Sequence, residues 1–312
     1  MEFLKLLESI RIPALTGFMS AITYLGDEVC FMAMALLVFW CIDKRRGYYI
    51  FIVGLLGTVV NQFLKLWFRI PRPWVIDPEF TPVEAAIEGA GGYSFPSGHT
   101  QTAVGTYGSI ALGFKKAWVR WLCLAVIVIV PFSRMYLGVH TPLDVGVSYL
   151  IGGGLAIGLY FCFKDERSFE KCAKYVFVLL LAACVAYAIF VFTYAFPENT
   201  DAHNLASGVK NACTVGGTSL ALLVIYIYDT KKLNFSTEAP LLGQLLKLVL
   251  GLALVVAIKS GFKPVLNAFF GLFLDGAVRD NISNFTRYFL MGIFAGCIWP
   301  HSFPLFAKIG KK

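Results

Sequence analysis

The sequence predicts an all-α fold, a polytopic membrane helical bundle of about nine transmembrane helices. Of the 312 residues, 58% are hydrophobic and only 15% are charged, whereas soluble domains have about 45–50% apolar and about 25% charged residues. The apolar residues also fall in runs of about 20, the length that crosses a bilayer. This composition excludes a disordered or a nucleic-acid-binding protein, so no nucleic-acid partner is expected.

Nine apolar runs follow one another along the chain, joined mostly by short connections. The eighth run is interrupted by Lys259, Lys263 and Pro264, so residues 264–274 are read as a re-entrant or interfacial piece. The runs are centred on residues 22–42, 47–67, 98–114, 121–137, 143–163, 175–196, 209–228, 243–262 and 286–306.

The remaining parts of the chain give a simple domain organisation. Residues 1–19 begin with charged side chains at Glu2, Lys5, Glu8 and Arg11 among apolar ones, a spacing typical of a short amphipathic helix lying on the membrane interface. Residues 20–170 form a catalytic membrane core that carries all the motifs described below, and residues 171–312 add accessory helices. The eight cysteines lie in or beside apolar runs, so we interpret them as small buried residues, with no metal-binding pair among them.

The basic residues of the connections predict the orientation of the chain. Sixteen of the 27 Lys and Arg residues fall on one side of the bundle, and cytoplasmic loops collect such residues. The N-terminus is therefore expected outside and the C-terminus in the cytoplasm. Residues 68–97 and 134–142 then face the periplasm, a lumen or the exterior. The sixteen residues are Lys44, Arg45, Arg46, Lys115, Lys116, Arg120, Lys164, Arg167, Lys171, Lys174, Lys231, Lys232, Lys247, Lys308, Lys311 and Lys312.

Three polar segments emerge on this outer side. The first segment contains Lys65 and Arg72, at the end of the second span. The second segment is residues 96–99, Pro-Ser-Gly-His, which open the third span. The third, residues 133–144, joins the fourth and fifth spans. Their convergence follows from hydropathy and loop charge alone, and it predicts an active site at the outer ends of the core helices.

Two of these segments contain helix starts. Ser97 is expected to cap the helix that begins at Gly98, where free N–H groups and the positive end of the helix dipole bind anions. His99 then lies in the first turn of that helix. Thr141 is expected to cap the next helix, and Asp144 can reach back over its start. A hydrogen bond from Asp144 to His140 is sterically natural and orients the imidazole.

Three cations complete this group of residues. Arg72 and Arg134 suit a bidentate grip on phosphate oxygens, and Lys65 supplies a point charge. Two histidines, a carboxylate, a helix start and these cations are the parts needed for displacement at phosphorus, in which one histidine attacks and the other protonates the leaving oxygen.

The three segments resemble the signature of the type 2 phosphatidic acid phosphatase superfamily, the lipid phosphate phosphatases: K-x6-RP, PSGH and SR-x5-H-x3-D. The resemblance covers roughly residues 20–160, with no departure at a motif position. The matching residues are Lys65, Arg72, Pro73, Pro96, Ser97, Gly98, His99, Ser133, Arg134, His140 and Asp144.

The resemblance implies a role for each of these side chains. His140 resembles the nucleophile that takes the phosphoryl group, Asp144 resembles its orienting carboxylate, and His99 resembles the general acid that later activates water. The family needs no metal, so no cofactor is expected. The residues that resemble the phosphate-binding set are Lys65, Arg72, Ser97, Gly98 and Arg134.

Two features narrow the resemblance to particular branches of the superfamily. Residues 24–29 and 133–140 are similar to the sphingosine-1-phosphate phosphatase branch, and this branch and the glucose-6-phosphatase branch both have extra C-terminal helices. Gly98 departs from the sphingosine phosphate branch, which tends to have Thr there.

The sequence therefore predicts an integral membrane phosphatase that hydrolyses lipid phosphomonoesters through a phosphohistidine, with a lipid phosphate and membrane lipids as its partners. Four alternatives stay open: an undecaprenyl diphosphate phosphatase, a phosphatidylglycerophosphate phosphatase, a lipid phosphotransferase and, from a different class, a phosphate-lipid transporter.

Overall fold

The computed structural model describes residues 1–309, and this described part is helical with no strand. Lys311 and Lys312, which the charge pattern assigns to the cytoplasmic side, lie outside it. The α-helices are α1 Glu2–Ser9, α2 Pro13–Thr23, α3 Glu28–Cys41, α4 Lys44–Phe68, α5 Pro73–Ile76, α6 Glu84–Ile87, α7 Gly98–Gly113, α8 Ala117–Tyr136, α9 Pro142–Phe163, α10 Glu166–Thr193, α11 Ala202–Tyr228, α12 Leu241–Phe270, α13 Gly276–Ile293 and α14 Phe303–Phe306.

The chain divides into two compact units. The first unit consists of Met1–Ala35, Tyr49–Cys172 and Ala195–Gly208. The second consists of Leu36–Tyr48, Ala173–Tyr194 and the chain from Val209 onward. Four helices, α3, α4, α10 and α11, contribute residues to both units.

The predicted all-α membrane bundle is confirmed, but the count of nine spans is not exact. Among the described residues, seven helices are long and apolar enough to cross a membrane, and an eighth span is formed if α2 and α3, bent by 52° at Asp27, count as one. The remaining expected span, the third in chain order, is α7, which has only 16 residues and so falls short of that length. At about 1.5 Å per residue it is about 24 Å long, against roughly 30 Å for the hydrocarbon core, so it extends through most of the thickness of the core.

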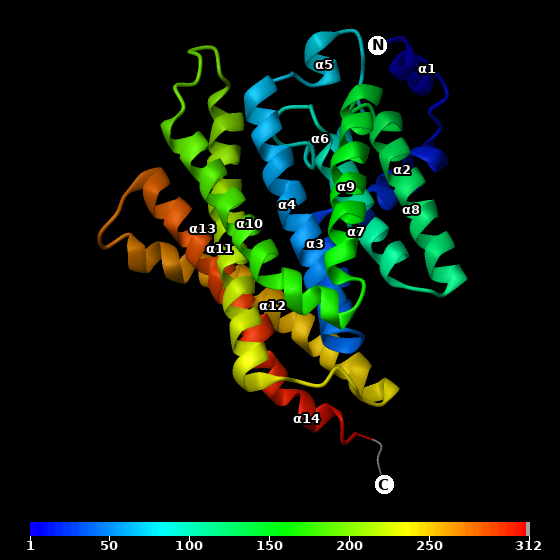
Figure 1. The fold of residues 1–312 in the computed structure, drawn as a ribbon. Coiled ribbons are helices and arrows are strands. Elements are labelled where there is room, and N and C mark those ends of the chain that lie inside the picture. Colours follow the sequence, from blue (N-terminus) through cyan, green and yellow to red (C-terminus); the bar gives the residue numbers. More distant parts are fainter. Residues whose placement is uncertain (310–312) are drawn as a thin grey trace. The chain divides into compact units, whose positions relative to one another are not determined.

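Helix α7 is the central element of the first unit. It packs against α8 on one side and α9 on the other, as Figure 1 shows. The contact with α9 is close because Gly152 has no side chain, and a Cβ there would lie 2.8 Å from the carbonyl oxygen of Gln101. Even polar residues of α7 are consequently buried, including Thr100, Gln101 and Thr106.

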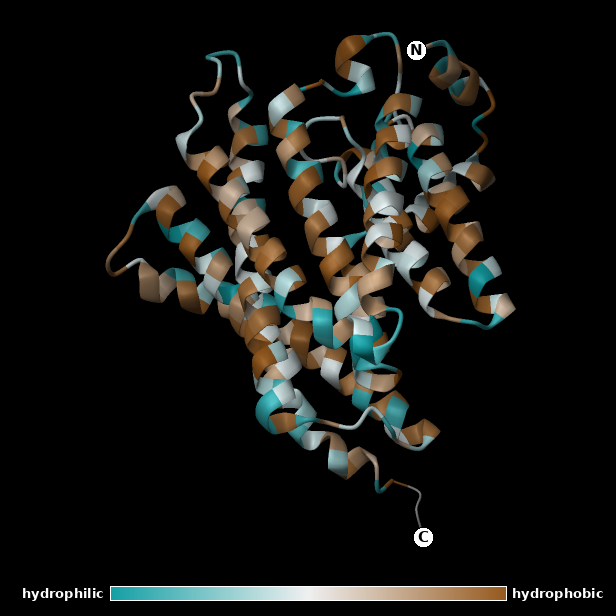
Figure 2. Cartoon of the chain, viewed as in Figure 1, coloured by the Kyte–Doolittle hydropathy of each residue, from teal (hydrophilic) through white to brown (hydrophobic). Residues whose placement is uncertain are grey.

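Hydrophobic residues predominate along the long helices (Figure 2), and many of them are exposed. Trp121 and Val128 of α8 are 71% and 65% exposed, and Leu150 of α9 is 76% exposed. Such a surface is unfavourable in water, so it indicates helices that are surrounded by lipid. The protein is a multi-pass integral membrane protein.

The N-terminal helix α1 has the predicted amphipathic character. Leu4 and Leu7 are buried against Phe80, and the ammonium group of Lys5 lies 2.8 Å from a carboxylate oxygen of Asp77. These contacts attach α1 to the loop that follows α5. The location of residues 1–19 at a membrane interface stays a prediction.

In the second unit, α12 corrects the expectation that Pro264 interrupts the eighth span. The helix continues through Pro264 to Phe270. Proline has no N–H to donate to the preceding turn, but Arg287 of α13 stabilises this region because its Nη1 donates to the carbonyl oxygen of Lys259, 3.2 Å away. Residues 264–270 are therefore part of a continuous helix.

Candidate active site

The start of α7 has the predicted cap. The backbone N–H of Thr100 donates to the Ser97 Oγ at 3.4 Å, so Ser97 is the N-cap and Gly98 and His99 are the first two helical residues. The first N–H groups of a helix have no acceptor within the helix, and the helix dipole is positive at this end. The start of α7 therefore favours an anion.

The start of α9 has the capping box that the sequence predicts. The Thr141 hydroxyl accepts from the N–H of Asp144, and the Thr141 N–H donates to the Asp144 Oδ2 at 2.7 Å. The two helix starts are joined directly, since the N–H of Ser97 donates to the Asp144 carbonyl and the Ser148 hydroxyl donates to the Ser97 carbonyl. The two capped ends thus hold Ser97 and Asp144 close together.

His140 is buried between these elements, with 2% of its surface exposed. Gly138, at a φ of +78° that other residues rarely adopt, shapes the turn before it. Arg72 Nη1 lies 3.0 Å from His140 Nε2, and because a guanidinium only donates, Nε2 is the acceptor. The proton of a neutral imidazole is then on Nδ1, and the lone pair of Nε2 points toward Arg72.

The expected hydrogen bond between His140 and Asp144 is a longer contact. The His140 Nδ1 lies 3.5 Å from the Asp144 Oδ2, and within the described chain Nδ1 has no hydrogen-bond partner. The Oδ2 atom accepts instead from the Thr141 N–H and from the Ser94 hydroxyl, each at 2.7 Å. Asp144 still faces Nδ1, where its negative charge favours the protonated nitrogen.

Lys65 and Arg72 are held by backbone carbonyls of the loop before α7. Lys65 donates to the carbonyl oxygens of Tyr93 and Ser94. Arg72 donates to those of Gly91, Gly92 and Val139 at 2.9–3.1 Å. Both side chains are buried, with 5% and 6% exposed. These bonds orient the two cations without neutralising their charge.

Arg134 is the least satisfied of the three cations. Its Nη1 donates to the Thr23 hydroxyl at 2.9 Å, but Nε and Nη2 are buried and have no hydrogen-bond partner in residues 1–309. Only 1% of this side chain is exposed. A buried guanidinium with free donors is unfavourable unless a ligand supplies the acceptors.

The surroundings of His140 keep the imidazole neutral. Burial lowers the pKa of His140 well below its ordinary value of 6.5, and the positive charges of Arg72 and Arg134 lower it further. Lys65 and His99 act in the same direction. A neutral imidazole has an unprotonated Nε2, and this atom can attack an electrophile when Arg72 no longer donates to its lone pair.

All eight site residues that the sequence predicts lie in the first unit, at the ends of α4, α7, α8 and α9. Sequence reasoning missed Ser94, whose hydroxyl binds Asp144, and Thr23, which binds Arg134. No spacing rule marks either residue, because each reaches its partner only through the tertiary fold.

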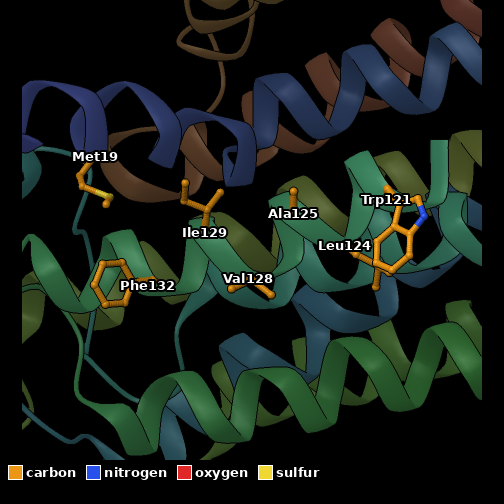
Figure 3. Close-up of a pocket in the computed structure, with 7 residues that line it drawn as sticks. All are labelled: Met19, Trp121, Leu124, Ala125, Val128, Ile129 and Phe132. Atoms are coloured by element: carbon orange, nitrogen blue, oxygen red, sulfur yellow. The ribbon is translucent and has the colours of Figure 1, made fainter. Parts of the chain in front are cut away.

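A groove of the first unit lies apart from this cluster. It is lined by Met19 of α2 and by apolar residues of α8 such as Trp121, Val128 and Phe132, as Figure 3 shows. Residues advance by about 100° per position on a helix, so Arg134 points about 200° away from Phe132, to the other side of α8. The groove has no charged lining residue and does not lead to the cations.

The fold and this cluster of residues together define a class of protein. It is a helical membrane protein whose buried cations surround a histidine near a helix start, an arrangement suited to an enzyme that acts on phosphate groups. Residues 46–168 match the model of the PAP2 superfamily, and residues 213–311 match the model described as PAP2 superfamily phosphatase, transmembrane extension. The chain belongs to the PAP2 superfamily of phosphatases.

Several characterised relatives are similar to parts of the chain. Undecaprenyl-diphosphatase BcrC of Bacillus subtilis is 33% identical over 43% of this chain and 67% of its own length. Phosphatidylglycerophosphatase B of the same organism is 28% identical, over 53% of this chain and 81% of its own. Sphingosine-1-phosphate phosphatase 1 of Mus musculus is 27% identical, over 78% of this chain and 58% of its own length. No solved structure matches the chain.

Proposed function

We propose that this protein is a lipid phosphate phosphatase that hydrolyses a phosphomonoester through a phosphohistidine on His140. The observation that carries the proposal is the environment of the His140 imidazole. Its Nε2 lies 3.0 Å from Arg72, its Nδ1 faces Asp144, and it is buried near Arg134, two of whose nitrogens have no partner in the described chain. A phosphoryl dianion would supply acceptors for them.

In the first step, Arg72 transfers its hydrogen bond from the Nε2 of His140 to a phosphoryl oxygen, and Nε2 attacks phosphorus while the bond to the lipid oxygen breaks. The proton of Nδ1 stays on the imidazole, where Asp144 stabilises the positive charge that develops. His99 gives its proton to the leaving alkoxide. Arg72, Arg134, Lys65 and the first N–H groups of α7 stabilise the charge on the phosphoryl oxygens, the kind of interaction that is usually the largest contribution to such catalysis.

In the second step, water attacks the phosphohistidine. His99, now neutral, accepts a proton from the water as the new P–O bond forms and the P–N bond breaks. His140 regains its free lone pair and phosphate leaves. Residues 20–170 supply every group used in this cycle, so we propose that they are the catalytic core and that residues 171–312 are accessory.

The substrate that we favour is a long-chain lipid phosphomonoester. The similarity to sphingosine-1-phosphate phosphatase 1 extends over 78% of this chain, which is more than the catalytic motifs occupy. A polyprenyl diphosphate is the second candidate, because the relative BcrC is 33% identical in the region of the motifs. The two substrate classes differ in the number of phosphates, which an assay distinguishes directly.

The test is phosphate release from purified protein in detergent, with sphingosine 1-phosphate, phosphatidate, phosphatidylglycerophosphate and undecaprenyl diphosphate as substrates and EDTA present throughout. We expect release from a monoester without any acceptor lipid, and inhibition by vanadate. A requirement for an acceptor lipid would indicate a phosphotransferase. Activity that EDTA abolishes and magnesium restores would contradict the metal-free mechanism.

His99 provides a separate test of the two-step cycle. His99→Ala is expected to accumulate a phosphoenzyme slowly from an activated aryl phosphate, because the nucleophile is intact while water activation is lost. Acid-labile radioactive phosphate on the protein, absent from His140→Ala, is the expected signature. Normal turnover of His99→Ala would contradict the assigned role.

We also propose that the site opens on the side opposite the sixteen basic residues, which is the periplasm, a lumen or the exterior, and that the C-terminus is cytoplasmic. A membrane-impermeant thiol reagent applied to intact cells should then label Glu84→Cys and spare Lys116→Cys. The unsubstituted protein corrects for the native cysteines. The reverse labelling pattern would place the site at the cytoplasmic leaflet.

A further inference from the structure

Three buried polar side chains near the start of α7 have unpartnered atoms and are not used by this mechanism: Thr100 and Gln101 of α7 itself, and Asn61, which alone has both polar atoms unpartnered. Asn61 lies in α4 and is 1% exposed, and both its Nδ2 and its Oδ1 lack a hydrogen-bond partner among the residues that the structure describes. Buried carboxamides are nearly always hydrogen-bonded, because leaving both ends unpaired forfeits the bonds that water would provide. Both polar atoms of Asn61 are therefore open to a partner from outside the chain.

The position of Asn61 identifies where that partner lies. Its Oδ1 is 3.9 Å from the point where a Cβ on Gly98 would be, so the carboxamide borders the first residue of α7. Lys65 is four residues further along α4, on the same face of the helix. The carboxamide is thus next to both the helix start and one of the three cations.

A residue deeper in α7 gives a comparison. Thr106 lies eight residues after Gly98 in α7, about 12 Å further along the helix. It is 1% exposed and its Oγ1 also lacks a partner in the described chain. The two residues share burial and lack of hydrogen bonds, but only Asn61 borders the start of α7.

We propose that Asn61 is a further phosphate-binding residue, whose Nδ2 donates to a phosphoryl oxygen held at the start of α7. The inference rests on the proposed phosphatase function. The carboxamide adds a neutral donor to the charged donors of Lys65, Arg72 and Arg134, so it contributes to the orientation of the phosphoryl group without raising the charge of the site.

The test is orthovanadate binding to the purified full-length protein in detergent, measured by calorimetry and by the shift of the unfolding temperature. Asn61→Leu keeps the volume and removes both polar atoms, and Asn61→Ala is the second variant. Both should bind vanadate about tenfold more weakly, a loss of about 1.4 kcal/mol. Thr106→Val, the matched control, should bind vanadate as the wild type does.

Two measurements separate a ligand-binding role from a structural one. If Asn61 serves only the ligand, Asn61→Leu without vanadate should unfold at the wild-type temperature or above, because an unpaired buried carboxamide has been removed. Wild-type vanadate affinity in either Asn61 variant would overturn the inference. A structural role would be indicated instead if Asn61→Leu unfolded at a lower temperature without vanadate and the folded variant bound vanadate with wild-type affinity. That result would also overturn the inference.

Failure of this inference is distinguishable from failure of the proposed function. If wild-type protein neither binds vanadate nor releases phosphate from a lipid phosphate, the phosphatase proposal fails and the Asn61 inference fails with it. If wild-type protein does both, and the Asn61 variants match it in vanadate affinity and in KM, only the inference about Asn61 is wrong.

Discussion

The two units differ in how completely they satisfy the donors of their buried cations. In the second unit, the ammonium group of Lys44 lies 2.9 Å from a carboxylate oxygen of Asp229, and Lys247 donates to the carbonyl oxygens of Trp40 and Thr237. In the first unit, two guanidinium nitrogens of Arg134 have no partner in the described part of the chain.

This difference separates two uses of a buried cation. A cation paired with a carboxylate stabilises the fold, because its charge is compensated within the chain. A buried cation with several free donors costs stability, so it marks a place where an anionic ligand can supply the missing acceptors. The two free nitrogens of Arg134 thus indicate binding, whereas the ion pair of Lys44 with Asp229 indicates a contribution to folding.

The largest effect is expected at the nucleophile. His140→Ala should lower turnover by about 10³-fold or more, because no other group can form the phosphohistidine. The matched control is His301→Ala in the second unit, where His301 contacts the Tyr228 hydroxyl and no phosphate-directed residue. Phosphate release under saturating substrate measures both. Equal losses in the two variants would remove the distinction between the units.

Arg134 should separate activity from stability. Arg134→Gln is expected to lower kcat/KM by about 10²-fold, because it removes a preorganised donor to the phosphoryl oxygens. Its unfolding temperature should not fall, since free buried donors are lost with the guanidinium. Enzyme kinetics and thermal unfolding in the same detergent test this pair of outcomes. A destabilised variant would mean that Arg134 supports the fold.

Lys44 should show the opposite pattern. Lys44→Met leaves the buried Asp229 carboxylate without its cation and is expected to cost about 1–3 kcal/mol of stability. The kcat of the folded fraction should stay at the wild-type value. Adding Asp229→Leu should restore part of the stability, because no charge is then left unpaired. Chemical denaturation of the three proteins measures the effect.

The smallest expected effect is on the pH dependence of stability. Because burial and nearby positive charges lower the pKa of His140 below 6.5, the unfolded chain binds more protons at this residue just below that pH. The corresponding stability is fully present above 6.5 and is lost as the pH falls, by at most about 1.4 kcal/mol per pH unit. Unfolding temperatures between about pH 7.5 and about pH 5.5 should therefore fall less in His140→Gln than in the wild type. Parallel curves would contradict the lowered pKa.

Much of the architecture was predictable from local patterns. The apolar runs predict the membrane helices, and the residue types at the two helix starts predict the caps at Ser97 and Thr141, because capping depends on residues three positions apart. The span count is less exact, because hydropathy does not fix where a helix ends. The run at residues 98–114 corresponds to α7, which has only 16 residues and packs against α8 and α9.

The sequence by itself determined the membrane bundle, the two capped helix starts and the set of residues suited to phosphate. Only the tertiary structure decided how those residues bond. Asp144 accepts from Thr141 and Ser94 while His140 remains 3.5 Å away, and the free donors of Arg134 and Asn61 become visible only once their surroundings are packed. The physical reason is that a helix start is set by neighbours along the chain, whereas a buried polar group is satisfied, or left open for a ligand, by residues that are distant in sequence.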